Sequence, residues 1–109
     1  MLLLLDENLP KRPKLDFPHH EIYTIRDKQW NRIKNGELLK LLLENLFDAL
    51  LTFDKNLQYQ QNFSKYPITV FVLSANINSY TELNRLSPKV NEYLTSGLLH
   101  PGPVIIKED

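Results

Sequence analysis

The sequence of 109 residues contains no cysteine, which excludes disulfide bonds and thiolate chemistry and agrees with a reducing compartment. No apolar run is long enough to span a membrane. The leucine-rich start has no basic leader and no small-residue cleavage site, so it is not typical of a signal peptide. These absences predict a cytoplasmic protein with no membrane partner.

Charge of one sign is not in excess either, because 13 acidic residues balance 13 basic ones and the formal net charge is zero. Net charge therefore gives no support to a large surface for sequence-independent binding of nucleic acid, although it allows a local basic patch. The chain shows no internal repeat, low-complexity tract or linker. With 42% apolar and 24% charged residues, the sequence predicts one globular domain over residues 1–109 with a single hydrophobic core.

The sequence does contain five short apolar segments, each typical of a β-strand. Leu2–Leu5 is an unbroken apolar run that stops at Asp6, as a strand buried on both faces does at the rim of a sheet. Ile68–Leu73 is the clearest of the five, because it is β-branched and aromatic. The remaining predicted strands are His20–Ile25, Asp48–Phe53 and Val104–Ile106.

Helical patterns separate these segments. Gly36–Asn45 carries a wide leucine stripe, with Asn35 as the expected N-cap. Ser79–Gly97 begins with a capping box and ends at a glycine, and Pro88 is expected to kink this helix or divide it at Ser87. Shorter helices are predicted near Leu9 and over Lys55–Phe63, and Arg26–Asn35 is predicted to be a loop or a partial turn of helix.

Strands that alternate with helices predict an α/β fold with a parallel, doubly wound sheet and right-handed crossovers. In such sheets ligands bind outside the carboxyl ends of the strands. Four polar residues are expected at that edge, namely the strand-terminal Asp6 and Asp54, the helical Glu37, and Asn56. Three carboxylates and an amide suit a hard cation such as Mg²⁺ or Mn²⁺, which activates water and stabilises charge when a phosphodiester is cut.

Each of these residues also has a purely structural interpretation. Asp6, Asp54 and Asn56 are suited to cap a helix or a turn, and Glu37 in a first helical turn is favoured by the helix dipole. The joint pattern favours a site, because two independent apolar strands each end on an aspartate.

Basic residues follow both aspartates. Lys11 and Arg12 lie shortly after Asp6, and Lys55 is next to Asp54. These three side chains are candidates for contacts to a substrate phosphate, and a solvated helix face is the alternative interpretation.

Three segments of the chain resemble a known family. They are Leu3–Pro10 (LLLDENLP), Gly36–Leu39 (GELL) and Leu51–Leu57 (LTFDKNL). Together they resemble the PIN and PIN-like nucleases, and within them a compact bacterial group often found as the toxin half of toxin–antitoxin pairs. The resemblance extends over most of the chain and implies a PIN-like three-layer α/β/α sandwich with a mainly parallel sheet of about five strands.

The resemblance also implies roles for the acidic residues. Asp6 corresponds to the family's first metal-binding aspartate, Glu37 to its helical acid, and Asp54 to the aspartate after Thr52. Asn56 stands where many relatives have a fourth acid, which lowers the charge at the metal site. The family implies Mg²⁺- or Mn²⁺-dependent endoribonuclease activity on an RNA substrate.

Partner proteins are expected from the helices. The helix from Leu38 to Leu46 and the one from Leu83 to Leu94 carry more apolar surface than a small sheet is expected to cover. The excess predicts a homodimer or an antitoxin protein as partner.

Two other functions remain open. A phosphoacceptor domain similar to response-regulator receivers has matching residues after its strands, but it leaves Glu37 and Asn56 without a role. A catalytically inactive PIN-like binding module is the other, and Asn56 is the only hint of it. The residues that match a receiver are Asp6, Glu7, Asp54, Ser74 and Lys107.

Overall fold

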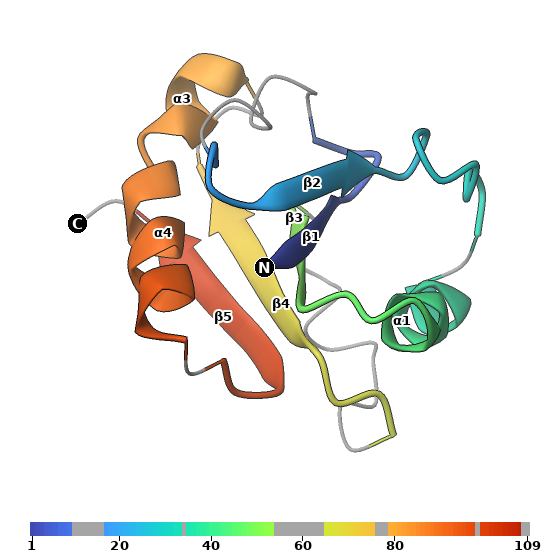
Figure 1. Ribbon diagram of the computed structural model, residues 1–109. Coiled ribbons are helices and arrows are strands. Elements are labelled where there is room, and N and C mark those ends of the chain that lie inside the picture. The colour runs from blue at the N-terminus through green and yellow to red at the C-terminus, as the bar shows by residue number, and fades with distance from the viewer. Residues whose placement is uncertain (10–16, 34, 54–64, 76–78, 98, 108–109) are drawn as a thin grey trace.

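The computed structural model describes residues 1–9, 17–33, 35–53, 65–75, 79–97 and 99–107. Five strands form one sheet in which every neighbouring pair is parallel (Figure 1). The strands are β1 Leu2–Leu5, β2 Glu21–Thr24, β3 Ala49–Thr52, β4 Thr69–Ser74 and β5 Gly102–Lys107. The predicted α/β class and the parallel sheet of five strands are therefore confirmed.

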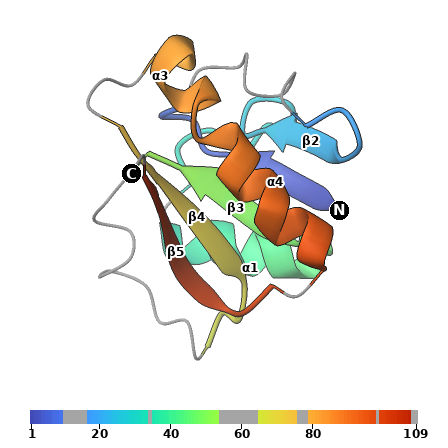
Figure 2. The same cartoon turned by 90° about the vertical axis from the view of Figure 1, so that its left-hand side faces the viewer.

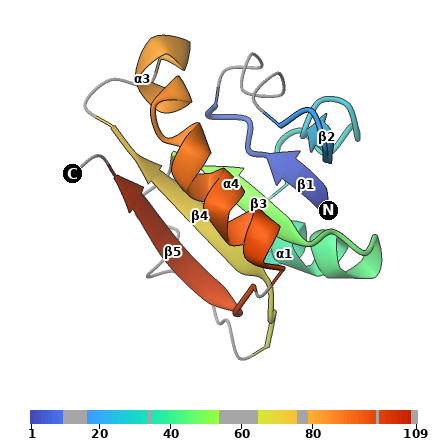
Figure 3. The same ribbon diagram turned by 60° about the vertical axis from the view of Figure 1, so that its left-hand side comes forward.

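Helices cover both faces of this sheet, which explains why the central strands are apolar on both sides. Helix α1, Asn35–Glu44, packs through its leucines on the face that carries Leu4 and Val70. Helices α3, Tyr80–Asn84, and α4, Ser87–Ser96, pack on the opposite face. Figures 2 and 3 show α4 in front of the sheet and α1 behind it.

The predicted division of the last helix at Ser87 is confirmed. Ser79 caps α3, because its hydroxyl oxygen accepts a hydrogen bond from the Glu82 backbone N–H at 3.4 Å. Pro88 lies in the first turn of α4, where its missing N–H costs no helical hydrogen bond. Gly97 ends α4 in the left-handed conformation, with φ of 71°.

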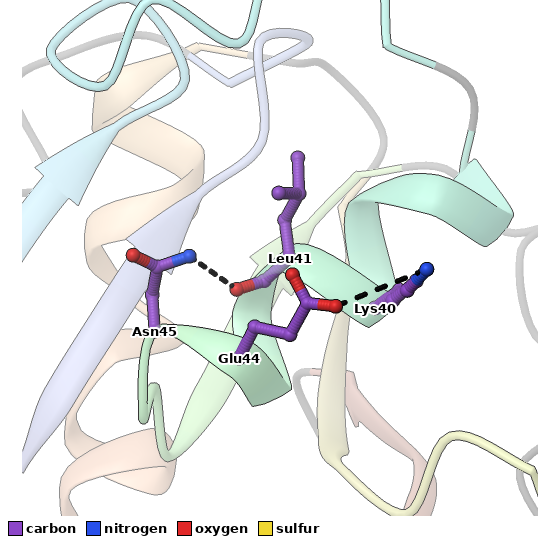
Figure 4. Close-up of polar contacts among 4 residues, drawn as sticks. All are labelled: Lys40, Leu41, Glu44 and Asn45. Atoms are coloured by element: carbon purple, nitrogen blue, oxygen red, sulfur yellow. Dashed lines mark hydrogen bonds and ion pairs between the residues drawn. The ribbon is translucent and has the colours of Figure 1, made fainter.

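Helix α1 begins at Asn35 itself, so the prediction of Asn35 as N-cap is wrong by one residue. At its other end, the Leu41 carbonyl accepts two hydrogen bonds from Asn45, one from the backbone N–H at 2.9 Å and one from the side-chain amide at 2.8 Å (Figure 4). Lys40 and Glu44 form an exposed ion pair at 3.9 Å one turn apart. These contacts close the helix before the chain enters β3.

The crossover from β4 to β5 has an unusual hand. The strand order is β2-β1-β3-β4-β5, so the connections from β2 to β3 and from β4 to β5 advance in the same direction. Their helices lie on opposite faces, so the two crossovers have opposite hands. With the strands of Figure 3 pointing upwards and α4 in front, β5 lies to the left of β4. The prediction of right-handed crossovers is therefore wrong for this connection.

Burial of apolar surface accounts for this exception. The face under α4 carries Leu51 and Phe71, which are both at most 1% exposed. Val90 and Leu94 of α4 cover these side chains, together with Leu86, the residue directly before α4. A helix on the other face would leave this apolar surface with less cover, and the loss would outweigh a preference of hand.

Candidate functional site at the carboxyl edge of the sheet

The sheet positions a site where β1 and β3 end. Going outward from β1, one neighbour is β2 and the other is β3, so the strand order reverses between β1 and β3. Connections leave the sheet on opposite faces at such a switch point, and the crevice between them is where doubly wound folds bind ligands. Asp6 lies there, directly after β1, and its backbone N–H donates to the Leu51 carbonyl of β3 at 2.9 Å.

The Asp6 carboxylate is held in a fixed orientation. Its side chain is only 9% exposed. One oxygen accepts a hydrogen bond of 2.8 Å from the Glu7 backbone N–H. The other accepts one of 2.8 Å from the hydroxyl of Thr52, which is fully buried. Hydrogen bonds to a charged group contribute roughly 1.5–3 kcal/mol each, so both contacts resist rotation of the carboxylate.

Asn8 extends this network across the two loops. Its side-chain amide donates to the Thr52 hydroxyl oxygen at 3.4 Å, and its carbonyl oxygen accepts from the Phe53 backbone N–H at 3.2 Å. The turn after β1 is therefore tied to the end of β3. Neither Asn8 nor Thr52 was given a role from the sequence, although both lie in the segments that resemble PIN-like nucleases.

A cavity of about 250 Å³ adjoins the Asp6 carboxylate. It lies between the turn after β1 and the loop after β2. Its lining combines the acidic Asp6 and Glu7 with the basic Arg26 and the amide of Asn31. The other described residues that line it are Leu9, Thr24 and Ile25. The geometry therefore offers two carboxylates and one cation around a single space.

Arg26 and Asn31 are site residues that the sequence analysis missed. They lie in a segment without helical or strand periodicity, so pattern gave no reason to place them near Asp6. The only signal is that Arg26 comes directly after the second strand region, on the same edge as Asp6. Glu7 was considered only for a receiver-like domain, but its side chain is exposed and lines the cavity.

Most of the other predicted site residues cannot be placed. Glu37 lies in the first turn of α1 with an exposed side chain. Five of the predicted site residues lie outside the described ranges, namely Asp54, Asn56, Lys11, Arg12 and Lys55. Among the residues that the structure does describe, no three His, Asp or Glu side chains gather closely enough to hold a metal ion. Convergence of Asp6 with Glu37 and Asp54 stays a prediction.

The donor set at the cavity nevertheless fits a hard divalent cation. Mg²⁺ in proteins is commonly bound by one or two carboxylates, with water and phosphate in the remaining positions. Two residues that line the cavity, Asp6 and Glu7, have carboxylate side chains of the kind that such a cation requires. Thr52 and the Glu7 N–H orient Asp6 in the way that outer hydrogen bonds orient metal ligands.

A histidine with a lowered pKa, His20, lies at the opposite edge of the sheet. The ring of His20 contacts the Met1 ammonium, with 2.9 Å between the ammonium nitrogen and Nδ1. Burial lowers the pKa of His20, the positive charges of Met1 and His19 lower it further, and Asp48 opposes them. Because Met1 and His20 precede β1 and β2, this group lies away from Asp6.

The fold and the site define a class, an α/β protein with a parallel sheet and a cavity beside Asp6 at the carboxyl edge of that sheet. Comparison with protein-family models, with curated proteins and with solved structures finds no match for the chain. No helix within the described ranges is long and apolar enough to cross a membrane.

Proposed function

We propose that this protein is a PIN-like, metal-dependent endoribonuclease whose reaction centre is the cavity beside Asp6. The observation that carries the proposal is the buried carboxylate of Asp6, which Thr52 orients at the switch point of a parallel sheet. The three sequence segments that resemble PIN-like nucleases support it, and two of them contain Asp6 and Thr52.

In this proposal Asp6, Glu37 and Asp54, with Asn56, hold Mg²⁺ or Mn²⁺. The bound cation supplies Lewis-acid stabilisation of the negative charge that develops on the phosphodiester. The substrate is RNA, and Lys11, Arg12 and Lys55 contact its phosphates.

The protein's own groups prepare the cavity for that reaction. The Thr52 hydroxyl and the Glu7 backbone N–H fix the Asp6 carboxylate before substrate binds. Preorganised charge of this kind avoids reorganisation at the moment of reaction.

A cleavage assay on pooled RNAs tests the function directly. We expect strand cuts with Mn²⁺ or Mg²⁺ and none with EDTA, because the carboxylates act through the cation. Equal cleavage in EDTA would contradict the metal requirement. An intact RNA pool in all three conditions would contradict the nuclease, and Mn²⁺-dependent RNA binding without cleavage would support the inactive binding module instead.

A receiver-like phosphoacceptor is the second candidate, because one observation favours it. The order β2-β1-β3-β4-β5 is also that of flavodoxin-like folds such as receivers, and Ser74 pairs in register with Lys107 at the carboxyl edge. The cavity beside Asp6 opens on the β2 side, however, and neither Ser74 nor Lys107 lines it. Incubation with acetyl phosphate and Mg²⁺ separates the two, since a phosphoacceptor gains a phosphoryl group by mass spectrometry.

A toxin role with an antitoxin partner, or a homodimer, remains part of the proposal. The stripe leucines that motivated it, such as Leu39, Leu42 and Leu86, are buried between the helices and the two faces of the sheet. Among the described residues, the large apolar side chains left exposed are Leu46, Tyr93 and Ile105. Tyr93 and Ile105 line one hollow together, so the apolar surface that this part of the chain offers to a partner is small.

A further inference from the structure

The loop between β2 and α1 is held in one defined shape. Thr24 and Asp27 bind each other reciprocally, since the Thr24 N–H donates to the Asp27 carboxylate at 2.8 Å and the Asp27 N–H donates to the Thr24 hydroxyl at 3.0 Å. The Trp30 N–H donates to the Ile25 carbonyl at 3.0 Å. This loop therefore presents its side chains from a fixed backbone.

Aromatic packing attaches the same loop to the core. The ring of Trp30 lies edge-on to Phe47, with 5.9 Å between their centroids. Tyr23 meets Phe47 at 6.3 Å, and the Lys28 ammonium lies 4.2 Å from the centre of the Tyr23 ring. Two residues of the loop, Gln29 and Arg32, also have positive φ, at 61° and 65°. Such a conformation persists in non-glycine residues where the surroundings enforce it.

Arg26 is placed by this loop over the cavity of Asp6 and Glu7. Within the part of the chain that the structure describes, its guanidinium has no ion pair or hydrogen bond. The neighbouring Asp27 carboxylate accepts from the Thr24 N–H. An exposed guanidinium beside two carboxylates, across one cavity, suits a ligand that is itself anionic and contacts a cation on the carboxylate side.

We propose that Arg26 binds a phosphate of single-stranded RNA and positions the scissile phosphodiester over Asp6. This inference rests on the proposed nuclease function, but it concerns substrate binding and is measurable without catalysis. Guanidinium groups bind phosphate oxygens through two parallel N–H donors, so Arg26 is suited to hold one phosphate in a fixed orientation. Asn31, on the same cavity, supplies an amide within the same loop.

The test measures the affinity of fluorescently labelled single-stranded RNA for the whole chain in EDTA, where metal-dependent cleavage does not occur. Arg26→Gln is compared with Arg32→Gln, because Arg32 is exposed in the same loop but does not line the cavity. We expect Arg26→Gln to weaken binding about tenfold and to reduce the slope of log K against log salt by about 0.7, the value for one phosphate contact in a single strand. Arg32→Gln is expected to change affinity less than about twofold. The fluorescence of Trp30, the single tryptophan, reports whether the loop keeps its packing in each variant.

The outcomes separate this inference from the nuclease itself. Equal weakening by both substitutions would mean diffuse attraction and would overturn the role of Arg26, as would unchanged binding by Arg26→Gln. Wild-type RNA binding that depends on Arg26, without cleavage in Mn²⁺, would sink the nuclease proposal and leave the phosphate site standing. Wild-type RNA cleavage at a rate that Arg26→Gln does not change, at RNA concentrations below Kd, would overturn the role of Arg26 and leave the nuclease proposal standing.

Discussion

At the scale of single residues, the hydroxyl of Thr52 determines how the site is organised. It donates to Asp6 at 2.8 Å and accepts from Asn8 at 3.4 Å, in a position with no exposure to solvent. Valine has nearly the same shape as threonine but cannot donate or accept. Replacing Thr52 therefore tests the hydrogen bonds with little change in packing.

Thr52→Val is expected to lower the free energy of unfolding by about 2 kcal/mol, because a hydrogen bond to a charged group is lost inside the protein. Thr52→Ser keeps the hydroxyl and removes one buried methyl group, which costs about 1 kcal/mol. Urea denaturation at pH 7 measures both variants. A valine variant as stable as the wild type would show that the network contributes nothing.

His20 makes the stability of the folded protein depend on pH. Its pKa in the folded protein is below the ordinary value of 6.5, because burial and the nearby positive charges disfavour the imidazolium. The unfolded chain therefore binds the proton first as pH falls, so stability decreases from pH 6.5 downwards and the full loss is reached below the folded pKa.

His20→Asn removes the titrating group and keeps an acceptor for the Met1 ammonium. We expect the difference in unfolding free energy between pH 7.5 and pH 5 to be smaller in this variant than in the wild type. Urea midpoints at several pH values provide the measurement. If both proteins lose stability in parallel over this range, the lowered pKa of His20 is not responsible.

Single residues also show how far sequence reasoning reaches. Asp6 was predicted because an apolar run ends there, and that signal is local. Thr52 was not, because its role depends on pairing between β1 and β3, which are more than forty residues apart in the chain. Arg26 was missed because an irregular loop has no period from which a direction can be inferred.

At the scale of elements, the end of α1 breaks a local rule. The Phe47 N–H donates to the Leu42 carbonyl at 2.9 Å and the Leu46 N–H to the Leu43 carbonyl at 3.2 Å, which is the Schellman pattern. Glycine usually occupies the left-handed position of that motif, as Gly97 does after α4. Here the position holds Leu46, with φ of 61° and a side chain that is 81% exposed.

Leu46→Gly is therefore expected to stabilise the protein by about 0.5–1 kcal/mol. The left-handed conformation costs a leucine roughly 1–2 kcal/mol, and the extra freedom of glycine in the unfolded chain returns part of that gain. Leu46→Ala is the control, because it removes the exposed side chain and keeps the strain. Thermal melting of the three proteins measures the effect. An alanine variant as stable as the glycine variant would show that the left-handed conformation at position 46 costs no free energy.

Elements were the most predictable part of the fold. Ser79 and Gly97 gave both ends of the last helical region, and Pro88 gave the division at Ser87, because caps and proline act through neighbouring residues. The left-handed crossover from β4 to β5 was not predictable in this way. It depends on which face of the finished sheet still has uncovered apolar side chains, which is a property of the whole molecule.

At the scale of the whole molecule, the order of the strands creates the candidate site. Reversal between β1 and β3 brings Asp6 and Thr52 together, and the loop after β2 completes the cavity with Arg26. The second half of the predicted metal site, Glu37 and Asp54, is a matter for experiment. Cleavage at the carboxyl edge of the sheet is therefore the central claim to test.

The most direct test combines RNA cleavage with thermal melting in Mn²⁺ for the wild type, Asp6→Asn and Asp48→Asn. Asp48 is a matched control at the amino edge, where its carboxylate accepts from the Leu2 N–H at 2.7 Å. The asparagine at position 6 keeps an oxygen for Thr52 but loses the anionic ligand. We predict a Mn²⁺-induced rise in melting temperature and RNA cleavage for the wild type and Asp48→Asn. For Asp6→Asn we predict no such rise and at least a 100-fold loss of cleavage, on the order expected when a metal ligand is removed. Cleavage by Asp6→Asn at the wild-type rate, with an undiminished rise in melting temperature, would contradict the account.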